Sequence, residues 1–242
     1  MSVCFSKLGS MGRLGNSLFQ IAATISLAAR NNDTYQFPRW TYYENDFPNL
    51  KNCFVDNLPK QPHVYTEPYF HYKEIPYKKD IDLCGYFQSW RYFQDQEGLI
   101  RHLFEFKNRY ERQDATAIHC RLGDYVKLGQ DYYIDLMKTD YYEKAMDIVK
   151  ADKYLIFSDD IDFCTSKFVG NKFEFVKMDS DVDELSLMAS CTNQIIANSS
   201  FSWCGAWLND NPNKTVIAPS QWFGPKLAHD TKDLIPKEWL VL

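Results

Sequence analysis

The feature that most constrains this chain is the alternation of short apolar runs with amphipathic segments in its second half. The apolar runs have the composition of buried strands and lie at residues 115–119, 154–157, 173–176, 194–197 and 215–218. Between them, apolar residues recur at helical spacing over residues 141–150, 161–168, 184–190 and 201–208. Strands that alternate with helices in this way form βαβ units with parallel strands. The pattern therefore predicts a doubly wound, Rossmann-like α/β domain.

The first half of the chain is less regular. A short apolar run at residues 3–7 precedes a glycine-bearing loop and then a helical pattern with Leu18 and Ile21 on one face. We expect Asn16 to cap this helix. Residues 36–79 are rich in Pro, Tyr and Asn and lack periodicity, which predicts an irregular aromatic region. Its aromatic side chains either pack against one another or offer stacking surfaces for sugar rings.

Composition limits the classes of function. Of the 242 residues, 45% are hydrophobic and 24% are charged, as in ordinary globular proteins. The formal net charge of −5 disfavours nucleic acid and anionic membranes as partners, so we expect any phosphate site to be small. No apolar run approaches the roughly 18 to 20 residues that span a bilayer. Seven scattered cysteines and the lack of an export signal predict a cytoplasmic protein. Because the cysteines lack the spacing of metal ligands, we expect no metal site.

The loops that follow the predicted strands hold the candidate site, because parallel sheets bind ligands beyond the carboxyl ends of their strands. Arg121 and Asp124 follow the strand that ends at His119. A guanidinium can hold a phosphate through two parallel hydrogen bonds, which suits Arg121 to a diphosphate leaving group. The alternative is an ordinary surface pair between Arg121 and Asp124.

A second candidate anion site follows the strand at residues 194–197. Residues 198–202 (NSSFS) lead directly into the predicted helix at 201–208. Amide N–H groups and serine hydroxyls at a helix start bind phosphate, although serine and asparagine are also common N-caps. Two such sites at neighbouring strand ends favour phosphate binding more than either site alone.

The carboxylates between these two segments have two possible roles. Asp183 either accepts hydrogen bonds from N1 and N2 of a guanine or stabilises the start of its helix, where acidic residues are favourable. We expect Glu184 to act in helix capping. Asp159 and Asp160 follow the strand at residues 154–157 with the same ambiguity and a weaker argument, and their context predicts no metal site.

Four segments together resemble glycosyltransferase family 11, the alpha-1,2-fucosyltransferases. They are residues 12–20 (GRLGNSLFQ), 85–89 (GYFQS), 119–125 (HCRLGDY) and 198–203 (NSSFSW). The resemblance implies an α/β fold of GT-B type, with two facing Rossmann-like lobes and mainly parallel sheets. Residues 1–110 would form the acceptor-side lobe and residues 111–242 the GDP-sugar-binding lobe. The implied reaction is inverting, metal-independent transfer of fucose from GDP-fucose to a glycan hydroxyl, the 2-OH of galactose, without a further cofactor.

The resemblance also assigns roles to residues. Arg121 would bind the diphosphate, His119 would help to position the nucleotide, and Asp124 would brace their loop. With Asp183 included, the predicted GDP-sugar-binding residues are Gly12, Gly15, Asn16, His119, Arg121, Asp183, Asn198, Ser199, Ser200, Phe201 and Ser202. A general base must lie within hydrogen-bond reach of the acceptor hydroxyl, and Asp124 and Asp131 are the candidates.

Two departures from the family pattern leave alternatives open. The family usually has two adjacent arginines, whereas Leu122 follows Arg121 here, which removes one charge that would neutralise phosphate. The family also often has Trp-Trp where this chain has Trp203-Cys204. In addition, residues 126–139 look trimmed. The alternatives are a transferase with another GDP-sugar donor or linkage, and a catalytically silent module that binds a GDP-sugar or a glycan. A dinucleotide oxidoreductase is disfavoured because no G-x-G-x-x-G follows the first strand.

Overall fold

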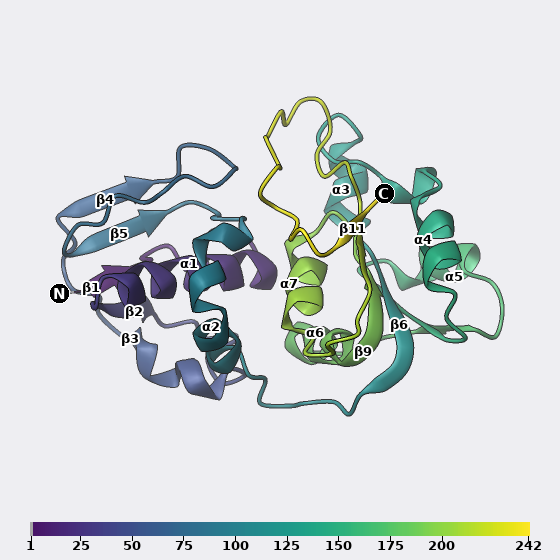
Figure 1. Cartoon of the computed structure of the whole chain (residues 1–242), viewed down its shortest axis with the longest axis horizontal. Helices are drawn as coiled ribbons and strands as arrows, with labels where there is room; N and C mark the ends of the chain where they lie inside the picture. Colours follow the sequence, from purple (N-terminus) through teal and green to yellow (C-terminus); the bar gives the residue numbers. More distant parts are fainter. Residues whose placement is uncertain (1) are drawn as a thin grey trace. The chain divides into compact units, whose positions relative to one another are not determined.

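The computed structural model describes residues 2–242, which divide into two compact units (Figure 1). Unit 1 comprises residues 2–108 and His229–Pro236, and unit 2 comprises Arg109–Ala228 and Lys237–Leu242. The chain therefore leaves unit 1 near the boundary expected at residue 110, but it also returns to unit 1 close to its end, which a single boundary does not describe. Among residues 2–242, no helix combines the length and apolar character needed to cross a membrane.

Unit 1 is built on a parallel sheet whose strand order is β3-β2-β1-β5-β4. Its strands are β1 (Ser2–Cys4), β2 (Thr34–Pro38), β3 (Phe54–Val55), β4 (His63–Thr66) and β5 (Ile81–Cys84). Its helices are α1 (Leu14–Arg30) and α2 (Glu97–Leu103), with the 3-10 turns η1 (Pro48–Cys53), η2 (Trp90–Tyr92) and η3 (Gln94–Gln96). The chain runs outward from β1 on one side and reaches β5 and β4 on the other, so the order reverses between β1 and β5.

Helix α1 starts earlier than the sequence predicted. It begins at Leu14, and Arg13 occupies the capping position without a side-chain hydrogen bond, so the prediction that Asn16 caps the helix was wrong. Asn16 lies inside the first turn, where its Oδ1 accepts a hydrogen bond from Gln88 Nε2 at 2.5 Å. Gly12 has a φ of +86°, and a Cβ there would lie 2.1 Å from the Asn16 side chain, so this loop requires glycine.

The aromatic region at residues 36–79 contains more regular structure than predicted, because its strands are too short to show a period. Trp40 and Phe47 are buried and stacked, with ring centres 5.9 Å apart and planes 10° apart. These rings support the packing interpretation. Tyr42 and Tyr69 are 88% and 55% exposed, so the stacking interpretation stays open for them.

Unit 2 is built on a parallel sheet whose strand order is β11-β10-β9-β6-β7-β8. Its strands are β6 (Gln113–Cys120), β7 (Tyr154–Ser158), β8 (Phe173–Phe175), β9 (Cys191–Ile195), β10 (Val216–Ala218) and β11 (Leu240–Val241). Its helices are α3 (Gly123–Leu128), α4 (Tyr141–Val149), α5 (Ile161–Lys167), α6 (Asp181–Ser190) and α7 (Ser200–Leu208), with the 3-10 turn η4 (Leu136–Lys138). This is the strand order of the Rossmann fold, in which the direction of winding reverses between β6 and β9.

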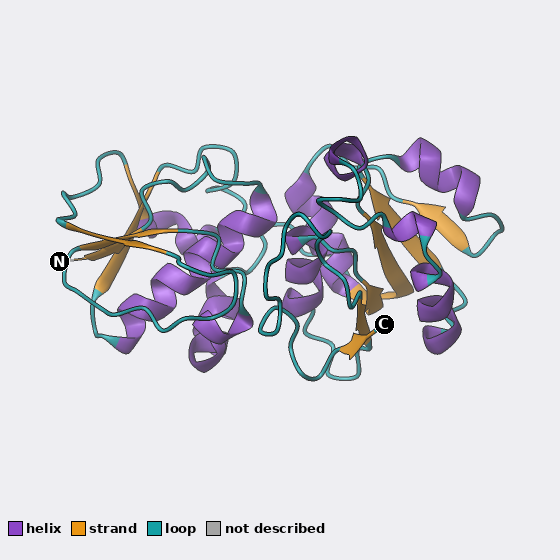
Figure 2. Cartoon of the chain, turned by 90° about the horizontal axis from the view of Figure 1, so that it is seen from above, coloured by secondary structure: helices purple, strands orange, loops and turns teal. Residues whose placement is uncertain are grey.

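Helices cover both faces of the unit 2 sheet (Figures 1 and 2). Alternate residues of β6 face opposite layers, because side chains alternate along a strand. Ile118 belongs to a core cluster with Tyr142 of α4, and Ala117 belongs to a second cluster with Met188 of α6. His119 lies two residues after Ala117 and so shares its face of the sheet, which is covered by α6 and α7.

The predicted elements of the second half are confirmed, with boundaries that shift by two or three residues in β6, β9 and α6. Strand β9 begins at Cys191 instead of residue 194. Its first residues are mostly polar and do not read as a buried strand in the sequence, but they pair with β6, where Cys191 lies opposite Gln113. Helix α6 begins at Asp181 instead of residue 184, because Ser180 provides the N-cap. The two mainly parallel α/β units agree with the predicted fold class.

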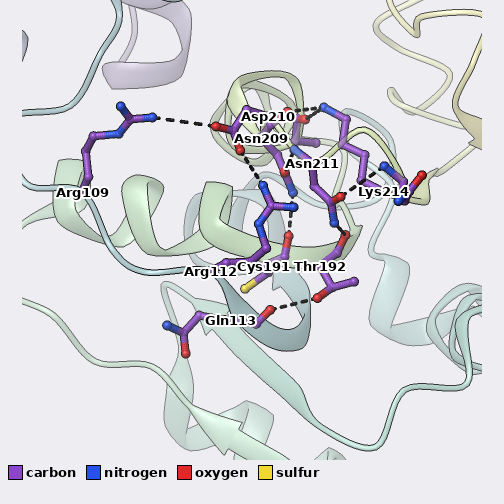
Figure 3. A network of polar contacts seen from close by, with 11 residues as sticks. Arg109, Arg112, Gln113, Cys191, Thr192, Asn209, Asp210, Asn211 and Lys214 are labelled. Atoms are coloured by element: carbon purple, nitrogen blue, oxygen red, sulfur yellow. Dashed lines mark hydrogen bonds and ion pairs between the residues drawn. The ribbon is translucent and has the colours of Figure 1, made fainter.

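A polar network joins β6, β9 and α7 at the amino-terminal edge of the unit 2 sheet (Figure 3). The Thr192 hydroxyl donates to the Gln113 carbonyl at 3.0 Å, and the Asn209 amide donates to the Cys191 carbonyl at 2.7 Å. Lys214 Nζ donates to the Asn209 carbonyl at 2.6 Å, which satisfies backbone at the end of α7. This network stabilises the edge opposite the carboxyl ends of the strands.

Candidate functional site

Two of the four family-like segments meet at the carboxyl edge of the unit 2 sheet. His119, near the end of β6, and Ser202, in the first turn of α7, form a hydrogen bond of 2.9 Å between Nδ1 and Oγ. Both side chains are buried. Because β6 and β9 are adjacent strands at the reversal of winding, this bond marks the position at which doubly wound sheets bind ligands.

His119 is a neutral imidazole. Burial, followed by the charge of Arg121, lowers the pKa of His119 to about 3. When the Ser202 hydroxyl donates to the Ser199 carbonyl at 3.3 Å, its oxygen accepts the bond from His119 Nδ1–H at 2.9 Å. The other ring nitrogen, Nε2, is then a hydrogen-bond acceptor.

Arg121 is oriented by carboxylates on two sides. Its Nη1 lies 2.8 Å from Asp159 Oδ2, and its Nη2 pairs with Asp124 Oδ1. The guanidinium carbon lies 5.3 Å from the ring centre of Tyr125, and 14% of the side chain is exposed. Asp124 thus pairs with Arg121 within this loop, and its role in bracing the loop stays a prediction. Asp159, which the sequence supported only weakly, is the second partner.

Asp159 also fixes the backbone of this loop. Its Oδ1 accepts a hydrogen bond from the Leu122 N–H at 2.8 Å. A Cβ on Gly123 would lie 2.3 Å from Asp159 Oδ2, so glycine is what lets the carboxylate approach. Asp159 directly follows β7, the neighbour of β6, and this position was the signal available in the sequence.

Leu122 stands where the family usually has a second arginine. Its side chain is 3% exposed and lies in the apolar cluster that includes Tyr142 and Ile118. A charged side chain at this position would enter the core instead of the ligand edge of the sheet. Residue 122 therefore cannot contribute a second positive charge to the ligand edge, because its side chain points into the core.

Residues 198–202 combine capping with a possible anion site. Ser199 is the N-cap of α7, where its Oγ accepts a hydrogen bond from Phe201 N–H at 3.3 Å. Asn198 Nδ2 donates to the carbonyls of Ile134 and Trp222 at 3.1 and 3.0 Å, so its amide group holds neighbouring loops. The Phe201 ring lies 5.5 Å from the imidazole, so this segment lines the same edge of the sheet.

The cap of helix α6 is Ser180, and the prediction that Glu184 serves in capping was wrong. The Ser180 Oγ accepts a hydrogen bond from Asp183 N–H at 3.1 Å. Burial, followed by the charges of Asp181 and Asp159, raises the pKa of Glu184 to about 7. Because Asp159 contributes to this shift, Glu184 lies near the site that contains Arg121.

Asp131, the other candidate base, lies at the surface. Its side chain is 62% exposed and forms an ion pair of 2.8 Å with Lys226. Gly12, Gly15 and Asn16 belong to unit 1, where they form the loop and first turn that precede and begin α1. Within residues 2–242, no group of three or more His, Cys, Asp or Glu side chains is placed to hold a metal ion.

The carboxyl edge of the unit 1 sheet carries the other two family-like segments. Gln20 is fully buried, and its Nε2 donates to the carbonyls of Met11 and Gly85 at 3.0 and 3.2 Å. It thereby joins the loop after β1 to the segment after β5. Glu67, which directly follows β4, contacts the same segment, and the sequence did not single it out.

A family model described as Glycosyl transferase family 11 matches residues 12–242. The chain belongs to this family. The match confirms the resemblance drawn from the four segments, and it confirms the enzyme class, a glycosyltransferase.

Curated relatives of this family 11 member are named as glycosyl-, colitosyl- and fucosyltransferases. The chain is 33% identical over 145 residues to O-antigen biosynthesis glycosyltransferase WbnK of Escherichia coli, which covers 54% of this chain and 48% of that protein. It thus spans about half the length of this relative. It is 25% identical over 295 residues to Alpha-1,2-colitosyltransferase of Escherichia coli, with 99% of each covered. It is 21% identical over 285 residues to Galactoside alpha-(1,2)-fucosyltransferase 2 of Oryctolagus cuniculus, covering 96% of this chain and 78% of that protein.

Solved structures of similar fold include POFUT1 in two liganded states. The chain superimposes on POFUT1 in complex with GDP with a TM-score of 0.54 and 12% identity, covering 89% of this chain and 97% of that chain. For POFUT1 in complex with GDP-fucose, the TM-score is 0.50 and the identity 13%, with the same coverage. At such identities the likeness concerns the fold, and it confirms the predicted GT-B type.

Proposed function

We propose that this family 11 member transfers fucose from GDP-fucose to the 2-hydroxyl of a galactose in a glycan acceptor, with inversion and without a metal ion. The observation that carries the proposal is the buried bond between His119 and Ser202 beside Arg121. It joins the two family-like segments of unit 2 at the ligand edge of a Rossmann-ordered sheet. Relatives named as alpha-1,2-transferases support the linkage.

In this proposal, the diphosphate binds between Arg121 and the amino end of α7. Helix N–H groups and serine hydroxyls favour an anion there, and the guanidinium adds charge-assisted hydrogen bonds. Asp124 and Asp159 partly neutralise Arg121, and Leu122 adds no charge. The N–H groups of α7 must therefore supply a larger share of the binding than in a site with two arginines.

The guanine would be recognised by side chains near the same strand ends. An ionised carboxylate accepts the N1 and N2 hydrogens of guanine, and an adenine could not supply that pair. Asp183 was the residue expected from the sequence. The structure adds Glu184 as a second candidate, because its carboxyl is partly buried and the charge of Asp159 contributes to its raised pKa. His119 Nε2 offers a further acceptor.

The transfer step then needs stabilisation of the leaving group. The acceptor oxygen attacks the anomeric carbon through an oxocarbenium-like state, and negative charge develops on GDP as the glycosidic bond breaks. Donors that are held in place before this charge appears stabilise it most effectively. Arg121, fixed by two carboxylates, meets that requirement.

Replacement of Arg121 by alanine tests the assignment. Removal of one such donor costs roughly 3 kcal/mol of transition-state stabilisation, so we expect turnover to fall by about two orders of magnitude. Arg112→Ala is the matched control, because Arg112 pairs with Asp210 beside the opposite edge of the sheet and its loss should leave turnover nearly unchanged. GDP release and product mass should be recorded with GDP-fucose in EDTA. Near-normal turnover of the Arg121 variant would contradict the assignment.

A second donor deserves inclusion in the same assay. The relative that is matched over 99% of both chains is named Alpha-1,2-colitosyltransferase, which favours a test with a colitosyl donor. The donor panel should also contain GDP-mannose and UDP-sugars. Transfer from another GDP-sugar would revise the donor. GDP binding without transfer to any acceptor would support the silent module that Leu122 suggested.

A further inference from the structure

The guanidinium of Arg121 rests on an aromatic ring as well as on two carboxylates. Its carbon lies over the ring of Tyr125, 5.3 Å from the ring centre, while Asp124 and Asp159 pair with its Nη atoms. A guanidinium is attracted to the face of an aromatic ring at this distance. Burial raises the pKa of Tyr125, so its phenol stays neutral and the contact is made by the ring. The direction of Arg121 therefore depends on where this ring lies.

Tyr125 is itself held by a second ring. The rings of Tyr125 and Tyr133 are stacked, with centres 3.8 Å apart and planes 14° apart. Tyr125 belongs to the short helix α3, whereas Tyr133 lies beyond the turn at Gly129, where φ is +83° and the Gly129 carbonyl accepts the Tyr133 N–H at 3.2 Å. Both tyrosine side chains are partly buried. Tyr133 thus fixes the position of the ring on which Arg121 rests.

The backbone around Tyr133 is anchored to a second loop. Tyr133 and Phe223 form an isolated antiparallel bridge, and their ring centres lie 5.9 Å apart. The Gly224 N–H donates to the Tyr132 carbonyl at 2.8 Å. A Cβ on Gly224 would lie 2.1 Å from the Gln130 carbonyl oxygen, so glycine permits the close approach of the two backbones. The two loops therefore hold each other beside the Tyr133 ring.

Asn198, the first residue of the NSSFS segment, ties both loops to the end of β9. Its side chain is 1% exposed, and its Nδ2 donates to the carbonyls of Ile134 and Trp222 at 3.1 and 3.0 Å. Ile134 directly follows Tyr133, and Trp222 directly precedes Phe223. The amide group has two N–H donors, and both are used in these bonds. Asn198 therefore acts on a bound diphosphate through the loops that it holds and not through its own amide.

We propose that Tyr133 positions Arg121 for stabilisation of the leaving group, through the ring of Tyr125. Asn198 supports this stack from the end of β9. The inference rests on the proposed function, in which Arg121 binds the diphosphate. Negative charge develops on GDP as the glycosidic bond breaks, and a donor that already points at that charge stabilises it most effectively. An arginine side chain has many rotamers, so contacts that hold its guanidinium in one direction increase its contribution.

Tyr133→Leu tests this role because it removes the ring. We expect kcat to fall roughly tenfold and the Kd for GDP to rise by about three- to tenfold. The Kd for GDP-fucose, measured by calorimetry without an acceptor, should change less than about twofold, because the donor does not yet carry the charge that develops on GDP. A general loosening of the site would weaken GDP and GDP-fucose alike, and that result would overturn the proposal.

Two variants in the same loop are controls. Tyr133→Phe keeps the ring, so its kcat should stay within about twofold of wild type. Tyr132→Leu changes the neighbouring side chain, which is 38% exposed and lies beside Lys226, and its kcat should also stay within about twofold of wild type. A loss of kcat in either control that equals the loss in Tyr133→Leu would overturn the proposal.

A double-mutant cycle with Arg121→Ala separates positioning from an independent structural effect. If Tyr133 acts through Arg121, adding Tyr133→Leu to Arg121→Ala should change kcat and the Kd for GDP by less than about twofold. Asn198→Asp, which loses both N–H donors, should depend on Arg121 in the same way. Effects that multiply with that of Arg121→Ala would overturn the proposal. If Tyr133→Leu does not fold, Tyr125→Leu provides the same cycle with the same criterion.

Failure of the proposed function gives a different result from failure of this inference. Wild-type protein that binds GDP but transfers fucose to no acceptor would contradict the proposed function, and the cycle in GDP affinity would still test the positioning of Arg121. Active wild-type protein with multiplying effects in the cycle would contradict the positioning alone. Wild-type protein that binds no GDP would overturn both, because Arg121 would then have no diphosphate to hold.

Discussion

Replacement of Glu67, a buried carboxyl group that follows β4, by glutamine should stabilise unit 1 at neutral pH. Burial raises the pKa of Glu67 from 4.5 to about 7, so between these values the folded protein binds a proton that the unfolded chain releases. The associated stability is fully present below pH 4.5 and is lost as the pH rises through 7. A shift of about 2.5 units corresponds to roughly 3 kcal/mol at 1.36 kcal/mol per unit. Relaxation around the ionised carboxylate reduces this, so we expect about 1 to 3 kcal/mol.

Native-state hydrogen exchange followed by mass spectrometry measures this difference within one unit of the protein. Peptides that cover β4 and β5 should be more protected in the Gln variant at pH 8, by about 1 to 3 kcal/mol in opening free energy. At pH 4 to 4.5 the two proteins should agree within roughly 0.5 kcal/mol, because wild-type Glu67 is then protonated in the folded state and at least about half protonated in the unfolded chain. Peptides from unit 2 serve as the internal control.

The pH dependence distinguishes this explanation from others. A changed hydrogen bond or altered packing in the variant would shift stability by a similar amount at every pH. Equal differences at pH 4 and pH 8 would therefore refute the claim that the buried carboxyl is the cause. Glu97→Gln, at an exposed ion pair, should show little difference at either pH.

Three further predictions concern unit 2. Asp159→Asn keeps an acceptor for the Leu122 N–H but removes the ion pair with Arg121, so kcat should fall at least about tenfold. The fall should exceed that of Asp124→Asn, because the Asp124 carboxylate is 44% exposed. Equal effects of the two variants in a turnover assay would contradict this ranking. Leu122→Arg restores the family arginine at a position that lies in the apolar core. It should therefore lower the free energy of unfolding in urea by more than about 3 kcal/mol without tightening GDP binding. A stable variant with higher affinity for GDP would refute the placement of Leu122. If ionised Glu184 binds guanine, the affinity for GDP measured by calorimetry should be roughly tenfold weaker at pH 6 than above pH 8, because the pKa of Glu184 is about 7. This pH dependence should vanish in Glu184→Gln. A flat pH profile of the wild-type protein would exclude the role.

Much of unit 2 could be predicted from the chain because its elements are long enough to show their period. Helix α4 and strand β7 lie within one residue of their expected bounds. Strands β3 and β4 of unit 1 were missed, because two or four residues cannot establish an alternating pattern. The return of His229–Pro236 to unit 1 was also missed. It depends on contacts such as the bond from Ser89 Oγ to the Asp233 carbonyl at 2.9 Å, which local sequence does not encode.

The sequence by itself determined the alternation of strands and helices, the four family-like segments and hence the family, because periodicity and spacing are properties of neighbouring residues. The same pattern placed Arg121 and Asp124 after a predicted strand, the resemblance added His119, and their roles stay predictions. Only the tertiary structure decided that Asp159 orients Arg121 and that Leu122 points into the core. It also decided that Glu67 reaches across to the segment after β5. Such partners depend on which strands become neighbours and which face each side chain takes, and both are fixed only when the sheets form.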